Sequence, residues 1–217
     1  MTVDESAPAS PALHALRTDA ISAPEVQRIL YCHGFASHFD PDKDKPRGLA
    51  TLAPVDGVTV DYTRMPTAVF DAFAAAMTAP RNTLIVGTSM GGFFAAWLGS
   101  ALGLPFVAIN PAITPAVTLQ RHVGAGQTHF GAPFVLSQAV VDAYADLPFR
   151  LDGAGTIVLD LGDAVIDAQA TRAAVGDRLP VIAFPGGSHR FDHLPDLLPI
   201  IAATHCSSKQ VWQSSHR

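Results

Sequence analysis

The chain has 217 residues, of which 48% are hydrophobic and 15% are charged, so it can bury a sizeable core and is not disordered over most of its length. A formal net charge of −5 and the scattered placement of its Lys and Arg residues argue against a nucleic-acid-binding protein, which would carry a basic stripe. No apolar stretch approaches the roughly 20 residues of a membrane-spanning helix, so we expect no membrane span.

This length suits one compact α/β domain, because two separate cores would each be small and weakly buried. We assign the domain to residues 26–205. Residues 1–25 are rich in Ala, Ser and Pro and are expected to form a flexible extension, and residues 206–217 a polar tail. Cys32 and Cys206 are too few for a disulfide scaffold, and residues 1–25 do not read as a secretory signal, so reduced thiols and a cytoplasmic location are expected.

Short β-branched or aromatic runs alternate with segments of helical periodicity. Strands are predicted, in chain order, at residues 28–33, 58–62, 83–86, 106–109, 156–161 and 181–184. Helices are predicted at residues 67–77, 90–102, 167–175 and 195–203. This alternation predicts an α/β fold with a mostly parallel sheet and helices on both faces, in which ligands bind at the carboxyl ends of the strands.

One span, residues 112–155, interrupts the alternation after the fourth predicted strand and is too long for a plain connection. Two interpretations stay open. The span can form a helical cap whose Phe134 roofs a substrate pocket, or it can pack flat on the flank of the sheet.

The strongest chemical signal is Gly87-Thr88-Ser89-Met90-Gly91, directly after a buried strand and directly before an apolar helix. A serine at such a sharp strand-to-helix turn projects its hydroxyl above the sheet, and the glycines allow close packing. A plain glycine-rich turn is the alternative. A nucleotide site does not fit, because the Gly-x-Gly-x-x-Gly spacing and the Walker lysine are missing.

A serine needs a base, and among nine histidines His189 is best placed, because it follows the last predicted strand through the flexible loop 185–188. His193 is expected at the start of the final helix. The two histidines lack the Glu of a zinc-protease motif, so no metal is implied.

The acid that orients the base should fall between nucleophile and histidine in the chain. Asp163, just past the fifth predicted strand, fits best. Its rivals are Asp160, inside that strand, and Asp167, which suits the N-cap of the following helix.

An oxyanion hole needs two N–H donors. We expect the backbone amide of Met90 to supply one. The other is expected from Phe35 in the turn His33-Gly34-Phe35 at the end of the first strand, where a plain turn is the alternative reading.

The motifs above occur along the chain together with Asn110-Pro111-Ala112 and Gly186-Gly187-Ser188-His189. With these motifs in this order, the chain resembles the YqiA-like family of small bacterial α/β-hydrolases over about residues 28–203. The resemblance implies the α/β-hydrolase fold and a cytoplasmic esterase of short acyl esters or thioesters, with a Ser89, Asp163 and His189 triad. The chain departs from the family in the strongly charged stretch 37–46 and in its longer N-terminus.

The predicted function is therefore a serine hydrolase that cleaves a small ester or thioester through an acyl-enzyme on Ser89. We expect Phe35, Asn110 and Phe134 to bind the substrate, a small molecule, and we expect no cofactor. Two alternatives stay open: a peptidase or amidase with the same triad, and a non-catalytic binding protein on a hydrolase scaffold.

Overall fold

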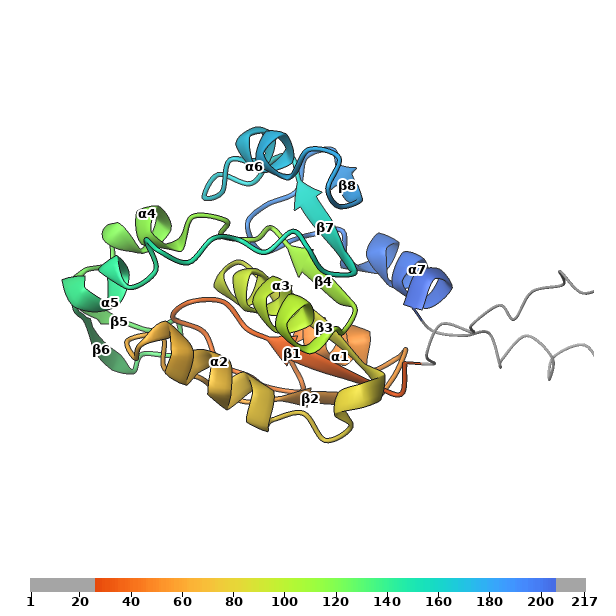
Figure 1. The fold of residues 1–217 in the computed structure, drawn as a ribbon, viewed down its shortest axis with the longest axis horizontal. Helices are drawn as coiled ribbons and strands as arrows, with labels where there is room; N and C mark the ends of the chain where they lie inside the picture. Colours follow the sequence, from red (N-terminus) through yellow and green to blue (C-terminus); the bar gives the residue numbers. More distant parts are fainter. Residues whose placement is uncertain (1–25, 206–217) are drawn as a thin grey trace, which may run out of the picture.

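The computed structural model describes residues 26–205 (Figure 1). The expectations for residues 1–25 and 206–217 lie outside this part and stay predictions. The strands are β1 (Arg28–Cys32), β2 (Val55–Gly57), β3 (Thr83–Thr88), β4 (Phe106–Ile109), β5 (Gly124–Gln127), β6 (Pro133–Leu136), β7 (Gly155–Asp160) and β8 (Val181–Phe184). The helices are α1 (Asp44–Leu49), α2 (Pro66–Ala75), α3 (Met90–Leu102), α4 (Pro115–Gln120), α5 (Gln138–Asp142), α6 (Ala168–Val175) and α7 (Leu194–His205), with a 3₁₀ turn, η2, at Pro80–Asn82.

Six strands form one sheet in the order β2-β1-β3-β4-β7-β8, and every neighbouring pair is parallel. The parallel sheet predicted from the alternation of elements is therefore present. Because all six strands run the same way, their carboxyl ends meet at one edge, where loops from distant parts of the chain come together.

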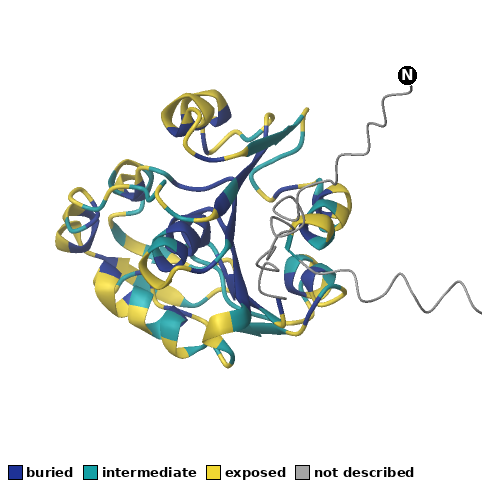
Figure 2. Cartoon of the chain, turned by 45° about the vertical axis from the view of Figure 1, so that its right-hand side comes forward, coloured by how far each residue is buried: buried dark blue, intermediate teal, exposed yellow. Residues whose placement is uncertain are grey.

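Helices cover both faces of this sheet, as Figure 2 shows with the sheet nearly edge-on. Side chains that alternate along each strand separate into two apolar clusters. The larger cluster includes Leu30, Ile85 and Phe106 with the inner faces of α2, α3 and α6. The smaller one includes Ile29, Leu84 and Val107 with α1 and α7. Within residues 26–205 no helix combines the length and apolarity needed to cross a bilayer.

The strand predicted at residues 58–62 is wrong. The strand beside β1 is β2, and the last pair of its register joins Tyr31 to Gly57. Beyond that point β1 soon ends, so residues 58–62 have no ladder partner. The Val60 N–H instead donates to Nε2 of His33 at 3.0 Å, and the Val60 and Tyr62 side chains are buried in the core.

The insertion at residues 112–155 contains the short helices α4 and α5, and also an antiparallel hairpin of β5 and β6 that the sequence did not predict. The hairpin turn is closed by a 2.8 Å bond from the Thr128 N–H to the Ala132 carbonyl, and Gly131 in it has a φ of +86°. At its tip the His129 N–H donates to the Ala36 carbonyl at 2.8 Å. The hairpin is thereby tied to the loop that follows β1.

Candidate active site

Ser89 lies between β3 and α3 at the carboxyl edge of the sheet. Its φ of +59° is one that residues other than glycine rarely adopt. Its N–H donates to the Ile109 carbonyl at 2.9 Å, which fixes the turn. A Cβ on Gly91 would lie 1.9 Å from the Cys32 carbonyl oxygen, and one on Gly87 would lie 2.0 Å from the Gly91 oxygen. Only glycines allow this approach of backbone to backbone, which presents the Ser89 hydroxyl above the sheet.

Three side chains from three loops form one hydrogen-bonded series here. Nε2 of His189 lies 3.0 Å from the Ser89 Oγ, and its Nδ1 lies 2.7 Å from Oδ2 of Asp163. A carboxylate can only accept, so Nδ1 donates to Asp163 and Nε2 is left to accept the serine proton. The residues come from the ends of β3, β7 and β8, which the parallel sheet brings to one edge.

The Asp163 side chain is only 1% exposed, yet it is held as a carboxylate. Burial alone would raise the pKa of this carboxyl. Hydrogen bonds from His189 and from the N–H groups of Ile166 and Val165 outweigh burial and hold the pKa below its usual value. Asp163 therefore faces His189 as a charged acceptor.

The two rival acids have other partners. Asp167 caps α6 and accepts from the Ala170 N–H at 2.9 Å, as its position indicated. Asp160 is fully buried and accepts from Nδ1 of His193 at 2.7 Å. The other oxygen of Asp160 accepts from the N–H groups of Ser188 and Asp192, at 3.1 and 2.8 Å. Asp160 thus holds both sides of the loop that carries His189.

The turn after β1 lies directly against the serine, because a Cβ on Gly34 would be 3.4 Å from the Ser89 Cβ. Nδ1 of His33 lies 2.8 Å from the Gly34 carbonyl oxygen, and its Nε2 accepts from Val60. Burial lowers the pKa of His33 from 6.5 to about 4, so its imidazole is neutral and donates through Nδ1. The N–H of Phe35 belongs to the same peptide unit and has no partner among residues 26–205. This support of the turn by His33 is not evident from the sequence.

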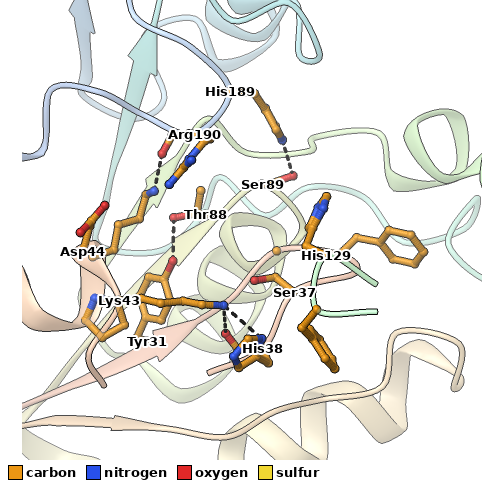
Figure 3. A pocket seen from close by; sticks show the side chains of 15 residues that line it. Tyr31, Ser37, His38, Lys43, Asp44, Thr88, Ser89, His129, His189 and Arg190 are labelled. Atoms are coloured by element: carbon orange, nitrogen blue, oxygen red, sulfur yellow. Dashed lines mark hydrogen bonds between the residues drawn. The ribbon is translucent and has the colours of Figure 1, made fainter. Parts of the chain in front are cut away.

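Ser89 and His189 open into a cleft of about 600 Å³ (Figure 3). One wall is the turn after β1, with Phe35. The hairpin tip contributes His129 and Phe130, and the Phe130 ring lies 4.5 Å from that of His38. The charged stretch 37–46 that set the sequence apart lines the same cleft, together with Arg190. That unusual run of charge was the sequence signal for Lys43, Asp44 and Lys45.

Two residues expected to contact substrate do not line this cleft. Asn110 is buried away from the cleft wall, because its side chain accepts from the Asp160 N–H at 2.8 Å and donates to the Ser188 carbonyl at 3.0 Å. Phe134 packs on Phe35 with the ring centroids 5.3 Å apart and lines a second hollow beside the cleft. The insertion reaches the cleft through Phe130 instead.

The fold is shared with solved structures of α/β-hydrolases. Est1E from Butyrivibrio proteoclasticus is 14% identical, with 83% of this chain and 87% of that chain covered and a TM-score of 0.62. Mouse alpha/beta hydrolase domain-containing protein 10 is also 14% identical, with 83% and 90% covered and a TM-score of 0.63. A monoacylglycerol lipase of Paleococcus ferrophilus is 12% identical, with 83% and 94% covered and a TM-score of 0.60. These likenesses establish the α/β-hydrolase fold.

A family model also matches the sequence over residues 28–206, which includes the whole sheet and every residue of the site. The model is described as Uncharacterised protein family (UPF0227).

Proposed function

The chain belongs to the uncharacterised protein family UPF0227, the YqiA family that its motifs indicated, and we propose that it is a serine hydrolase of small esters or thioesters. The observation that supports this most is the hydrogen-bonded series from Ser89 through His189 to Asp163, which begins at a strained turn. An α/β-hydrolase fold by itself does not fix an activity, so the proposal rests on the site.

In the proposed reaction the Ser89 Oγ attacks the carbonyl carbon of the substrate while its proton passes to Nε2 of His189. Asp163 keeps the imidazole in the correct tautomer and stabilises the imidazolium that forms. The carbonyl oxygen becomes an oxyanion, which the backbone N–H groups of Phe35 and Met90 bind. The Met90 N–H is suited to this because it begins α3, where the helix dipole favours negative charge.

The tetrahedral intermediate then collapses. The bond to the leaving oxygen or sulfur breaks, that atom takes the proton from His189, and Ser89 is left acylated. Water next gives a proton to His189 and attacks the acyl carbon. The carboxylic acid departs and Ser89 regains its proton, so the cycle balances without a cofactor.

Replacing the nucleophile tests this proposal. Ser89→Ala should leave a folded protein whose kcat/KM for 4-nitrophenyl butyrate falls by roughly 10⁵-fold or more, as on loss of other triad serines. Ser100→Ala, near the far end of α3, is the control and should retain activity. Hydrolysis that survives in Ser89→Ala would contradict the proposal. A wild type that hydrolyses only anilides would identify the peptidase or amidase alternative.

We further propose a cytoplasmic site of action. Cys32 is a free and buried thiol whose pKa burial raises well above its usual value, which suits a reducing compartment.

A further inference from the structure

One wall of the cleft beside Ser89 is basic. Lys43 and Lys45 line it from the stretch before and within α1, and Arg190 lines it from the loop directly after His189. Figure 3 shows Lys43, Arg190 and Ser89 around the same hollow, with Lys43 beside His38. Among the described residues that line the cleft, Asp44 is the only acidic one. The chain as a whole has a formal charge of −5, so this wall differs from the rest of the molecule.

These three cations have no ion-pair partner in the described part of the chain. No carboxylate among residues 26–205 lies within 4.0 Å of any of them, whereas Arg28 and Arg150 pair with Asp56 and Asp152. Asp44 does not neutralise the wall, because its carboxylate pairs with Arg47 at 3.0 Å. An anion that enters the cleft therefore meets cations that are not already neutralised.

The ammonium groups of the two lysines have different hydrogen-bond partners. Nζ of Lys43 lies 3.1 Å from Nδ1 of His38, close to the hairpin tip. Nζ of Lys45 donates to the Arg190 carbonyl, which connects α1 to the loop of His189. Burial lowers the pKa of Lys45, and Arg190 lowers it further, against the opposing effects of Asp44, Asp192 and Asp160. A partly buried ammonium beside a guanidinium is stabilised when an anion binds between them.

We propose that Lys43, Lys45 and Arg190 form a subsite that binds an anionic group, a carboxylate or a phosphate, on the substrate that Ser89 attacks. This inference rests on the proposed function and adds a requirement for charge to it. The cations lie inside a cleft that contains the serine, so they suit a small anionic molecule better than an extended polyanion. The anion can belong to the acyl part or to the leaving group.

Two pairs of esters separate these sources. For the leaving group, 4-carboxyphenyl butyrate is compared with 4-carbamoylphenyl butyrate, which has the same shape without the charge. For the acyl part, 4-nitrophenyl hydrogen adipate is compared with its neutral adipamate. The subsite predicts that wild type prefers the anionic member of at least one pair by about tenfold in kcat/KM, as one charge-assisted hydrogen bond contributes. The preference should shrink as salt is added.

Variants show whether these residues are responsible. Arg190→Gln and Lys43→Gln should each lower the anionic-to-neutral ratio of kcat/KM several-fold, mainly through a higher KM for the anionic ester. Arg81→Gln, an exposed change in η2 outside the cleft lining, is the control and should keep the wild-type ratio. Lys45→Gln is less suitable alone, because Lys45 also holds the Arg190 carbonyl.

Hydrolysis of the neutral esters with no anionic preference in either pair would overturn the subsite and leave the proposed function intact. An anionic preference that Arg190→Gln and Lys43→Gln both retain would also overturn it. If no ester is hydrolysed, the proposed function fails and the subsite fails with it.

Discussion

At the scale of single residues, each of the two acids near the end of β7 accepts a hydrogen bond from a different histidine of one loop. Asp163 faces His189, and Asp160 faces His193. They lie only three positions apart, but Asp160 points into the core from the last residue of the strand while Asp163 follows the turn. Among residues 26–205, four residues other than glycine have positive φ, namely Ala36, Ser89, Asn110 and Phe191, and all lie in loops at this edge of the sheet. Backbone strain is therefore concentrated where the chemistry is proposed.

The role proposed for Asp163 is tested by Asp163→Asn. An amide keeps the shape of the side chain but no longer holds the imidazole in the right tautomer or stabilises its charged form, so kcat should fall by roughly 10⁴-fold. Asp167→Asn is the matched control, since an Asn still caps α6, and it should keep kcat and stability near wild type. Steady-state kinetics with 4-nitrophenyl butyrate would show the difference. If Asp167→Asn is the more damaging change in a folded protein, the assignment is wrong.

Asp160 is predicted to be a positioning residue. The Asp160 carboxylate accepts from the N–H groups of Ser188 and Asp192 and from the His193 imidazole. In Asp160→Asn one of the two acceptor oxygens becomes an NH₂ donor, so at least one of these buried hydrogen bonds is lost. We expect the free energy of unfolding to fall by about 3 kcal/mol. We also expect kcat to fall while KM changes less, because the loop of His189 shifts. His193→Phe keeps an aromatic ring stacked on Phe184, so it should lower the free energy of unfolding and kcat less than Asp160→Asn does. A folded Asp160→Asn protein with full kcat would mean that this loop is held by other contacts.

At the scale of elements, the insertion borders the cleft through a hairpin rather than through a helical cap. Its tip carries Phe130, which lines the cleft and is 49% exposed. Phe134 lies one step back, packed on Phe35. Under the proposed function, the hairpin tip is the wall that an acyl chain would meet.

This arrangement predicts a preference for short acyl chains. Each buried methylene contributes about 0.8 kcal/mol, so a wall that stops the chain after a few carbons sets the optimum length. The 4-nitrophenyl esters from acetate to hexanoate should have higher kcat/KM than laurate or palmitate, and Phe130→Ala should move the optimum to longer chains. Phe134→Ala should lower thermal stability and leave the chain-length profile unchanged. The opposite pattern in the two variants would remove the role given to the hairpin tip.

Elements with a strong apolar pattern could be predicted from the sequence. The strand expected at residues 106–109 is β4, and the strand at residues 83–86 and the helix at residues 90–102 meet at Ser89 as the motif required. The hairpin could not be predicted, because β5 contains two glycines and no strand-forming residue, and β6 is a run of only four residues that begins with a proline. The hydrogen bond between His33 and Val60 could not be predicted from the sequence either, because it depends on where β1 and β2 end.

At the scale of the whole molecule, the buried neutral His33 links stability to pH. The folded pKa of His33 is about 4, against 6.5 for an exposed histidine. As the pH falls from 6.5 to about 4, the unfolded chain takes up a proton at His33 that the folded chain does not. Stability should therefore be lost across this window, by about 3 kcal/mol from this residue. The loss due to Asp163, whose folded pKa is lowered, comes at more acidic pH.

Urea unfolding of wild type and His33→Gln at a series of pH values measures this contribution. Above pH 6.5 the variant should be less stable by a constant amount, because it loses the hydrogen bonds to Gly34 and Val60. Below that pH the gap should narrow, since only wild type has the histidine. If the difference in unfolding free energy between the two proteins stays constant down to pH 4, His33 takes up its proton in the folded state as readily as in the unfolded one.

The central claim is that Ser89 becomes acylated, and covalent labelling of the full chain tests it most directly. The protein is treated with a fluorophosphonate, digested and sequenced by mass spectrometry, with Asp163→Asn treated in parallel. We predict one phosphonate adduct in wild type, on Ser89, and much slower labelling of the variant. An adduct on another residue, or none in a folded wild-type protein, would contradict the account.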